Sequence, residues 1–391
     1  MQSLLSWLLL LMLIFLPTHP PARADTPVRH LLLGNPSGAT TDVSQPNNYL
    51  VVRPQYALAY LRDDGIPRWV AWQLVASDLG STPRYTGNFF TDTSLPIGWY
   101  RVRHSDYTNS GYDRGHMVSS EDRTATIEDN EATFILTNAL PQAPRANRGP
   151  WLRLEEDGRD LASAGDEVYI VAGPVGQLGR LASTQVRIPA ATWKVLLAVP
   201  AGAGDPTMRV MTATRVIAIR IANDKDDATV LQSDDWQPYA TTADAVEAET
   251  GLDVFAALNP TIQRVIEARP NVGALGYTLI VSGTSALTTT VGTSFAPLTV
   301  RVARDTSLGD GPPVPGVELT LALLGSSANA SIGGDVVATA VSDANGVATF
   351  APLANLVPGS YRAEISANGV YVPAVWALTN VDVVYVPVVT R

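Results

Sequence analysis

A change in composition near residue 270 is the feature that most limits what this chain can fold into. Residues 25–269 mix charged, aromatic and apolar side chains, whereas residues 270–391 are rich in Val, Thr, Ala, Ser and Gly. The only basic residues in the second part are Arg301, Arg304, Arg362 and Arg391. A chain of 391 residues is also too long for one compact core. We therefore expect one domain at residues 25–269, a linker at residues 270–276 and a second domain at residues 277–391.

The N-terminus has the pattern of a targeting segment. An unbroken apolar run covers Leu4–Leu16 and is shorter than the roughly 20 residues needed to cross a bilayer. Ala22-Arg23-Ala24 then supplies the small residues of a cleavage site. We expect a signal peptide at residues 1–24, with a signal anchor as the alternative because no Lys or Arg precedes the run. The protein is then secreted or held at the cell surface, with no membrane span after cleavage.

The C-terminal part has the pattern of short strands. Apolar and polar residues alternate over 298–302 and 317–323, which is the period of a half-buried strand. Asn345-Gly346 predicts a two-residue hairpin, and Val383–Val388 predicts an edge strand. Residues 342–350, with Pro-Gly-Ser-Tyr at 358–361, resemble bacterial Ig-like domains of the invasin/intimin type. The resemblance implies an all-β sandwich that acts as a spacer or contacts a cell surface or another protein.

The first part mixes strands and helices. Strands are predicted at residues 49–52, 69–74, 168–171, 195–199, 210–211 and 216–221. Helices are predicted at residues 244–249, before a stop at Gly251, and at 260–268, with a proline in the first turn. This order favours an α+β domain.

Composition excludes several kinds of chemistry. The chain has no cysteine, which excludes disulfides, thiolate zinc sites, iron–sulfur clusters and thiol nucleophiles. Its net charge of −10 argues against a protein that coats nucleic acid electrostatically. Catalysis is left to the four histidines, the carboxylates and the hydroxyl groups. We expect His30 and His104 at the surface.

One segment concentrates groups suited to anion chemistry. His116 follows Asp113-Arg114-Gly115, so a general base stands beside an arginine able to bind an anion, and a glycine permits unusual backbone there. Asn147, Trp151 and Glu155 are spaced so that a helix would place them on one side. Asparagine and glutamate supply the oxygen ligands that a hard cation such as Mg²⁺ prefers.

Taken in chain order, these segments match a known family. They read Asp-Arg-Gly-His at 113–116, Asn-x-x-Pro-Gln at 138–142 and Asn-x-x-x-Trp-x-x-Leu-Glu at 147–155. With Arg84–Phe89 upstream and Glu249–Phe255 downstream, they resemble the DNA/RNA non-specific endonucleases, the ββα-metal (His-Me finger) group that includes Serratia nuclease and endonuclease G. The resemblance spans roughly residues 45–260. It implies an α+β fold with a central antiparallel sheet.

The resemblance also implies roles at the reacting centre. His116 is expected to be the general base, so the rate should fall as the pH drops through its pKa, near 6.5 if unperturbed. Asn147 is expected to be the single protein ligand of a hydrated Mg²⁺, with Mn²⁺ or another divalent cation as alternatives. Glu155 is expected to hold water molecules bound to the metal without touching the metal itself.

Further roles follow from the same resemblance. Asn138 is expected to orient the site, Arg84 to clamp a phosphate, and Arg114 to make a second phosphate contact or a structural one. Asp113 is expected to accept structural hydrogen bonds, and Trp151 to pack in the core.

The function indicated is a secreted Mg²⁺-dependent endonuclease that hydrolyses phosphodiester bonds of DNA and RNA without sequence specificity. Two alternatives remain open at this point. One is a surface adhesin that uses the nuclease fold only for binding. The other is a toxin-type nuclease whose Ig-like part targets a partner.

Overall fold

The structure is a computed structural model that describes residues 28–226, 233–270, 277–304, 311–325, 337–353, 357–368, 370 and 373–381. The predicted signal peptide, residues 271–276 of the predicted linker and the predicted strand at 383–388 lie outside these ranges. Within them, no helix is long and apolar enough to cross a membrane.

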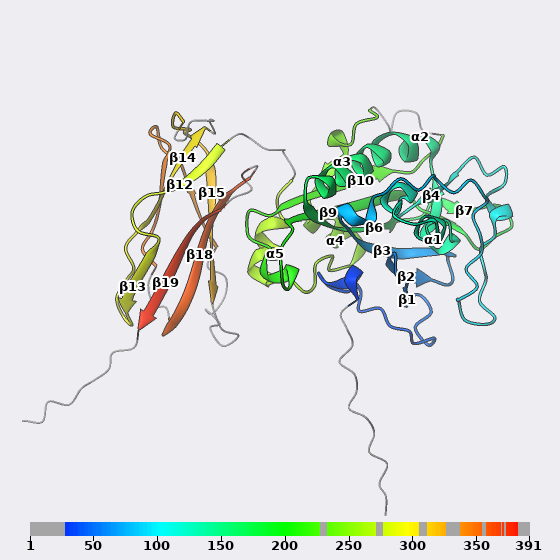
Figure 1. Ribbon diagram of the computed structural model, residues 1–391, viewed down its shortest axis with the longest axis horizontal. Coiled ribbons are helices and arrows are strands. Elements are labelled where there is room, and N and C mark those ends of the chain that lie inside the picture. Colours follow the sequence, from blue (N-terminus) through cyan, green and yellow to red (C-terminus); the bar gives the residue numbers. More distant parts are fainter. Residues whose placement is uncertain are drawn as a thin grey trace, which may run out of the picture.

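A seven-stranded antiparallel sheet is the centre of the N-terminal unit (Figure 1). Its strands, in spatial order, are β1 (Tyr49–Val52), β2 (Ala57–Leu61), β3 (Ile66–Leu74), β6 (Asp166–Val175), β9 (Ala191–Pro200), β10 (Arg215–Ala222) and β11 (Ala240–Thr241). Five of the predicted strands lie in this sheet, which confirms them and the central antiparallel sheet.

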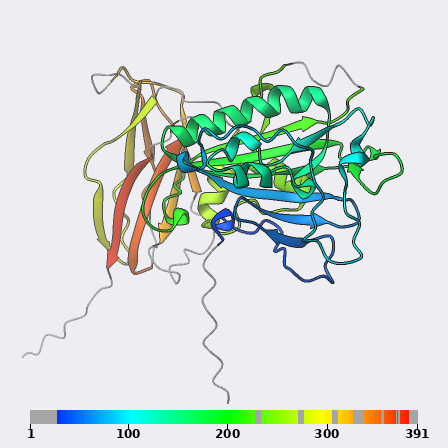
Figure 2. The same cartoon turned by 45° about the vertical axis from the view of Figure 1, so that its right-hand side comes forward.

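The sheet separates two hydrophobic clusters. Alternate side chains of β6 and β9 point to opposite faces, so Ile170 and Leu196 lie in one cluster, and Tyr169 and Val195 in the other. Helix α3 (Leu152–Ser163) covers the first face, and α4 (Ala243–Thr250) and α5 (Pro260–Ile266) cover the second (Figures 1 and 2). The remaining elements are α1 (Ile127–Ala132), α2 (Pro144–Ala146), β4 (Asp113–His116), β5 (Ala139–Gln142), β7 (Gly179–Arg180) and β8 (Arg187–Ile188).

Two predictions about this unit are wrong. Val210 and Met211 form no strand but lie in the loop before β10, where Val210 is apolar because it is buried against the second face. His30 is buried rather than exposed: its Nε2 donates to the Pro54 carbonyl at 2.8 Å, and its Nδ1 accepts from the Gln73 amide at 3.2 Å. The bond that Nδ1 accepts requires a neutral ring, and burial lowers the pKa of His30 to about 4.

The C-terminal unit has two sheets around one core. One contains β12 (Tyr277–Val281), β14 (Leu298–Arg304) and β17 (Val347–Phe350), and the other β13 (Ala286–Thr290), β19 (Ala374–Val381), β18 (Gly359–Ala367), β15 (Glu318–Gly325) and β16 (Val337–Val341). Asn345-Gly346 forms the expected turn, with Gly346 at φ 73°, but the predicted hairpin is wrong. The flanking strands β16 and β17 belong to different sheets, because local turn chemistry does not decide which strands pair.

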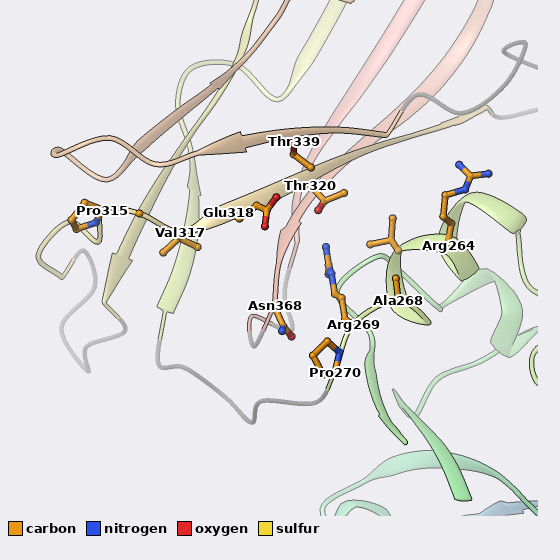
Figure 3. Close-up of a pocket in the computed structure, with 12 residues that line it drawn as sticks. Arg264, Ala268, Arg269, Pro270, Pro315, Val317, Glu318, Thr320, Thr339 and Asn368 are labelled. Atoms are coloured by element: carbon orange, nitrogen blue, oxygen red, sulfur yellow. The ribbon is translucent and has the colours of Figure 1, made fainter. Parts of the chain in front are cut away.

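Polar side chains join the two units. Glu364 of β18 is fully buried, and its Oε2 accepts from the Thr212 amide at 2.8 Å and from the Thr212 hydroxyl at 3.0 Å. Arg269 donates to the Thr212 carbonyl at 2.8 Å and to the Ser366 hydroxyl at 3.0 Å. A cavity of about 630 Å³ lies at this junction, with Arg264 and Arg269 on its N-terminal side and Glu318 among its C-terminal lining residues (Figure 3). None of the three sequence motifs lines it.

Candidate active site

Backbone pairing brings the first two motifs together. Strand β4 carries Asp-Arg-Gly-His and pairs antiparallel with β5, so Asp113 lies opposite Gln142 and His116 opposite Ala139. The third motif joins them through Trp151, whose indole Nε1 donates to the His116 carbonyl at 3.3 Å. Trp151 is buried, which confirms its predicted core position. Two strands and the turn that precedes α3 thus hold His116 beside the first cluster.

Gly115 is required for a different reason from the one expected. Its backbone is not in the left-handed region, so the expectation of an unusual conformation is wrong. A Cβ at this position would instead lie 2.2 Å from Oε1 of Gln142 and 2.5 Å from its Cβ. Only glycine therefore lets the Gln142 side chain cross β4 beside His116.

Aromatic rings enclose the His116 imidazole. The Phe89 ring lies 4.7 Å and the Phe134 ring 4.8 Å from it, measured between centroids. Its Nε2 is buried and has no hydrogen-bond partner among the described residues. Burial, and secondarily the Arg84 charge, lower the pKa of His116 to about 3. The ring is neutral well below pH 6.5, so the unperturbed pKa used in the sequence-based expectation does not apply.

Arg84 lies beside this histidine. Its guanidinium is 5.1 Å from the centroid of Phe134, the ring that also contacts His116. It bonds the Ser120 hydroxyl and lies 4.0 Å from a Glu121 carboxylate oxygen. Half of the Arg84 side chain remains exposed. A fixed but accessible cation next to a neutral base is suited to binding a phosphate.

Asn147 is oriented from the β4 strand. Its Nδ2 donates to Oδ2 of Asp113 at 2.9 Å, and the Arg148 guanidinium pairs with the same carboxylate at 2.6 Å. Asp113 is thus the hydrogen-bond acceptor that the sequence predicted. Because the amide is held by its nitrogen, Oδ1 is the atom able to bind a cation.

The continuous helix expected from Asn147 to Glu155 is not formed. Residues 147–151 make a π-helical turn, and Gly149 has φ −108° and ψ −110°, outside the helical region. Beyond that turn, α3 carries Glu155 inward. Glu155 Oε1 lies 3.2 Å from Lys194 Nζ, with both side chains buried. Lys194 Nζ also lies 4.0 Å from the Trp151 ring centroid. Burial raises the pKa of Glu155 and lowers that of Lys194.

Asn138 and Arg114 position the backbone. The buried Asn138 amide accepts from the Val118 amide at 3.0 Å and donates to the carbonyls of Val118 and Thr133 at 3.0 and 2.8 Å. It thereby fixes the chain just after His116. Arg114 donates to the His104 carbonyl at 2.8 Å and stacks on Tyr107, so here it makes a structural contact. His104 itself is partly exposed.

Three neighbours of the site were not assigned from the sequence. Lys194 had one available signal, because a lysine interrupts the apolar run of β9. Asn223 is buried and braces β5 by bonding the Pro141 carbonyl at 2.9 Å and the Ala143 amide at 2.7 Å. No local pattern marks Asn223, or Phe134 as a wall of the His116 pocket.

Known proteins resemble this chain over the same region. A family model described as DNA/RNA non-specific endonuclease matches residues 35–261. A nuclease from Nostoc sp. is 47% identical over 240 residues, covering 61% of this chain and 85% of the relative. A nuclease from Serratia marcescens is 29% identical over 264 residues, covering 64% of this chain and 90% of the relative. A solved chain of the EndoG/EndoGI complex is 22% identical, with a TM-score of 0.49, and the match covers 59% of this chain and 92% of that chain.

Proposed function

Because the chain belongs to the DNA/RNA non-specific endonuclease family, we propose that it hydrolyses phosphodiester bonds of DNA and RNA with His116 as the general base and a divalent cation held by Asn147. It is an endonuclease, and nucleic acids are its substrates. The observation that carries the mechanism is a half-buried, neutral His116 ring beside the half-exposed Arg84. Both groups act on the phosphate backbone, which carries no direct sequence information. Hydrolysis without sequence preference follows.

The residues present fit a hard divalent cation. Asn147 offers an amide oxygen, and its nitrogen is held by Asp113. One protein ligand suits Mg²⁺, which keeps most of its water molecules, and we propose Mg²⁺, with Mn²⁺ as the alternative. When bound, the cation would stabilise negative charge on the phosphate and the leaving oxygen. Glu155 would contact its water molecules only through the carboxylate edge that Lys194 leaves available.

His116 accepts the proton of the attacking water. The ring is neutral, and because Nε2 is buried, a water molecule meets the ring at Nδ1. Arg84 binds the phosphate and balances charge that develops on it. Asn138 keeps the ring in place by fixing the two residues that follow it.

Plasmid and RNA digestion test this proposal. The mature protein should cut both with Mg²⁺ and neither with EDTA. His116→Ala should lose about 10²–10⁴-fold in rate while the protein remains folded at the assay temperature. His104→Ala is the matched control, because that side chain is partly exposed and its contact to Arg114 uses the backbone carbonyl. Full activity of His116→Ala, or equal cutting in EDTA, would overturn the assignment.

We also propose a division into a signal peptide at 1–24, the nuclease domain at 25–269, a linker at 270–276 and an Ig-like domain at 277–391. The two sheets around one core in the C-terminal unit support the last assignment. The leader composition supports secretion. Mass spectrometry of the protein exported by a bacterial host should show an N-terminus at residue 25, and a retained Leu4–Leu16 segment would contradict cleavage.

A further inference from the structure

A cluster of three acidic side chains lies on the sheet face opposite His116. Asp244 and Glu247 belong to α4, and Glu267 caps the C-terminal end of α5. Each contributes a carboxylate oxygen, and these oxygens lie within 4.8 Å of one another. Both helices pack into the second-face cluster, whereas α3 and the strands around His116 pack into the first. The acidic cluster is therefore separate from the candidate active site.

Glu267 distinguishes this cluster from a solvated acidic surface. The residue is 4% exposed, and its Oε1 is buried without a hydrogen-bond partner among the described residues. An unpartnered buried carboxylate is costly unless something compensates it. Burial first, and then the carboxylates of Glu247, Asp244 and Asp253, raise the pKa of Glu267 to about 8. Three further carboxylates thus act on the buried Glu267, and a cation bound among them would compensate its charge.

Other contacts hold the cluster in shape. The Asp244 amide donates to the Glu267 carbonyl at 3.2 Å, which ties the start of α4 to the end of α5. Glu247 Oε1 accepts from the Val254 amide at 2.7 Å, and its other oxygen is left to turn toward the cluster. Asp244 is exposed and Glu267 is buried, so one side of the cluster opens to solvent and provides an entry path.

We propose that Asp244, Glu247 and Glu267 form a second cation site that binds Ca²⁺ and fastens α4 to the end of α5. Carboxylate oxygens are the ligands of hard cations. Two oxygens on opposite sides of Ca²⁺ are separated by about 4.6–5.2 Å, compared with about 4.2 Å for Mg²⁺. Oxygens that lie within 4.8 Å of one another can reach a single cation, and three carboxylates suit Ca²⁺ because Mg²⁺ is usually held by one or two carboxylates and keeps several water molecules. Water molecules complete the coordination on the open side.

The site would act on stability rather than on the reaction. Glu267 stands two residues before Arg269, which bonds both Thr212 and Ser366 at the junction between the units. A cation held by Glu267 therefore stabilises the end of α5 where the chain leaves the nuclease fold. A chain without cysteine has no disulfide for this purpose.

Calcium titration of the full mature chain tests the site. The titration uses the Asn147→Ala variant, because this substitution removes binding at the proposed catalytic cation site. Isothermal titration in this background should show one Ca²⁺ bound, with a dissociation constant of about 10⁻⁴–10⁻³ M, and Ca²⁺ should raise the melting temperature. Adding Glu267→Gln should abolish both effects, yet leave the melting temperature in EDTA equal or higher, because it removes an unpaired buried carboxylate. Asp244→Asn, at an exposed position, should weaken binding without affecting folding.

Glu249→Gln is the matched control, since Glu249 lies on α4 but pairs with Arg220 at 2.7 Å. It should keep the full response to calcium. The proposal is overturned if the Asn147→Ala protein binds no Ca²⁺ at millimolar concentration, or if Glu267→Gln retains the calcium-dependent stabilisation. Equal stabilisation by Mg²⁺ would overturn the assignment to calcium.

Discussion

The buried ion pair of Glu155 and Lys194 allows stability and catalysis to be separated. Nζ and Oε1 are 3.2 Å apart, and the Lys194 and Glu155 side chains are 1% and 8% exposed. Removing one partner leaves the other as an unpaired buried charge, at a cost of about 3–5 kcal/mol. Replacing both with neutral groups of similar size is close to neutral. Glu155→Gln and Lys194→Met should each destabilise by this amount, and the double variant should recover most of the loss.

Thermal and urea unfolding and a nuclease assay on the same four proteins provide the readouts. Each single variant should melt about 6–20 °C lower, at roughly 2–4 °C per kcal/mol for a unit of this size. If Glu155 also holds water molecules of a bound cation, the double variant stays inactive although its stability returns. Glu156→Gln on the same helix is the control, because its pair with Arg153 is exposed and should contribute little to stability. Wild-type stability of Glu155→Gln would refute the reasoning.

Four further predictions follow from described contacts. Asn138→Ala should cost at least about 2 kcal/mol in urea unfolding, because it leaves the Val118 amide and the Thr133 carbonyl without their partner; an unchanged midpoint would contradict this. The pKa of His30 is lowered to about 4 in the folded protein, compared with about 6.5 in the unfolded chain. Between these two pH values the imidazole is protonated only in the unfolded chain, so the free energy of unfolding should fall by about 3 kcal/mol from pH 6.5 to pH 4. His30→Gln should flatten that slope, and an equal slope in both proteins would exclude His30 as the cause. With saturating metal, kcat/KM should stay level as the pH falls through 6.5, because the pKa of the proposed base His116 is lowered to about 3. A pH–rate profile with its midpoint near 6.5 would show that burial does not lower the pKa of His116. Glu364→Leu should leave the Thr212 amide unpaired and split one calorimetric transition into two, whereas a single unshifted transition would contradict coupling at the junction.

Local patterns predicted the strands well and their partners poorly. The strands at residues 195–199 and 216–221 were recognisable because apolar side chains fill both faces of the central sheet. Val210 is also apolar and buried, but it lies in a loop. The periodicity of apolar residues alone cannot distinguish a buried loop residue from a strand residue. His30 could not be placed from the sequence, since its burial depends on a carbonyl at Pro54 and an amide at Gln73, distant in the chain.

The candidate site divides in the same way. The motifs located His116, Asn138 and Asn147, and the pairing of β4 with β5 brings the first two of these segments together. The motifs do not predict which side chains surround these residues. The pKa of His116 depends on Phe89 and Phe134 closing over it, and the partner of Glu155 comes from a strand 39 residues further along the chain.

The π-helical turn at Gly149 has a consequence for how freely the chain can change over evolutionary time. A Cβ at residue 149 would lie 3.0 Å from Oδ1 of Asp234, which belongs to a loop far away in the sequence. Glycine therefore keeps Asn147 and Trp151 facing different partners while Asp234 occupies the space beside it. Substitutions at residues 149 and 234 should therefore occur together. A lineage that replaces the glycine should also carry a smaller residue at 234 or a displaced Asp234 carboxylate, because a Cβ at 3.0 Å requires that carboxylate to move.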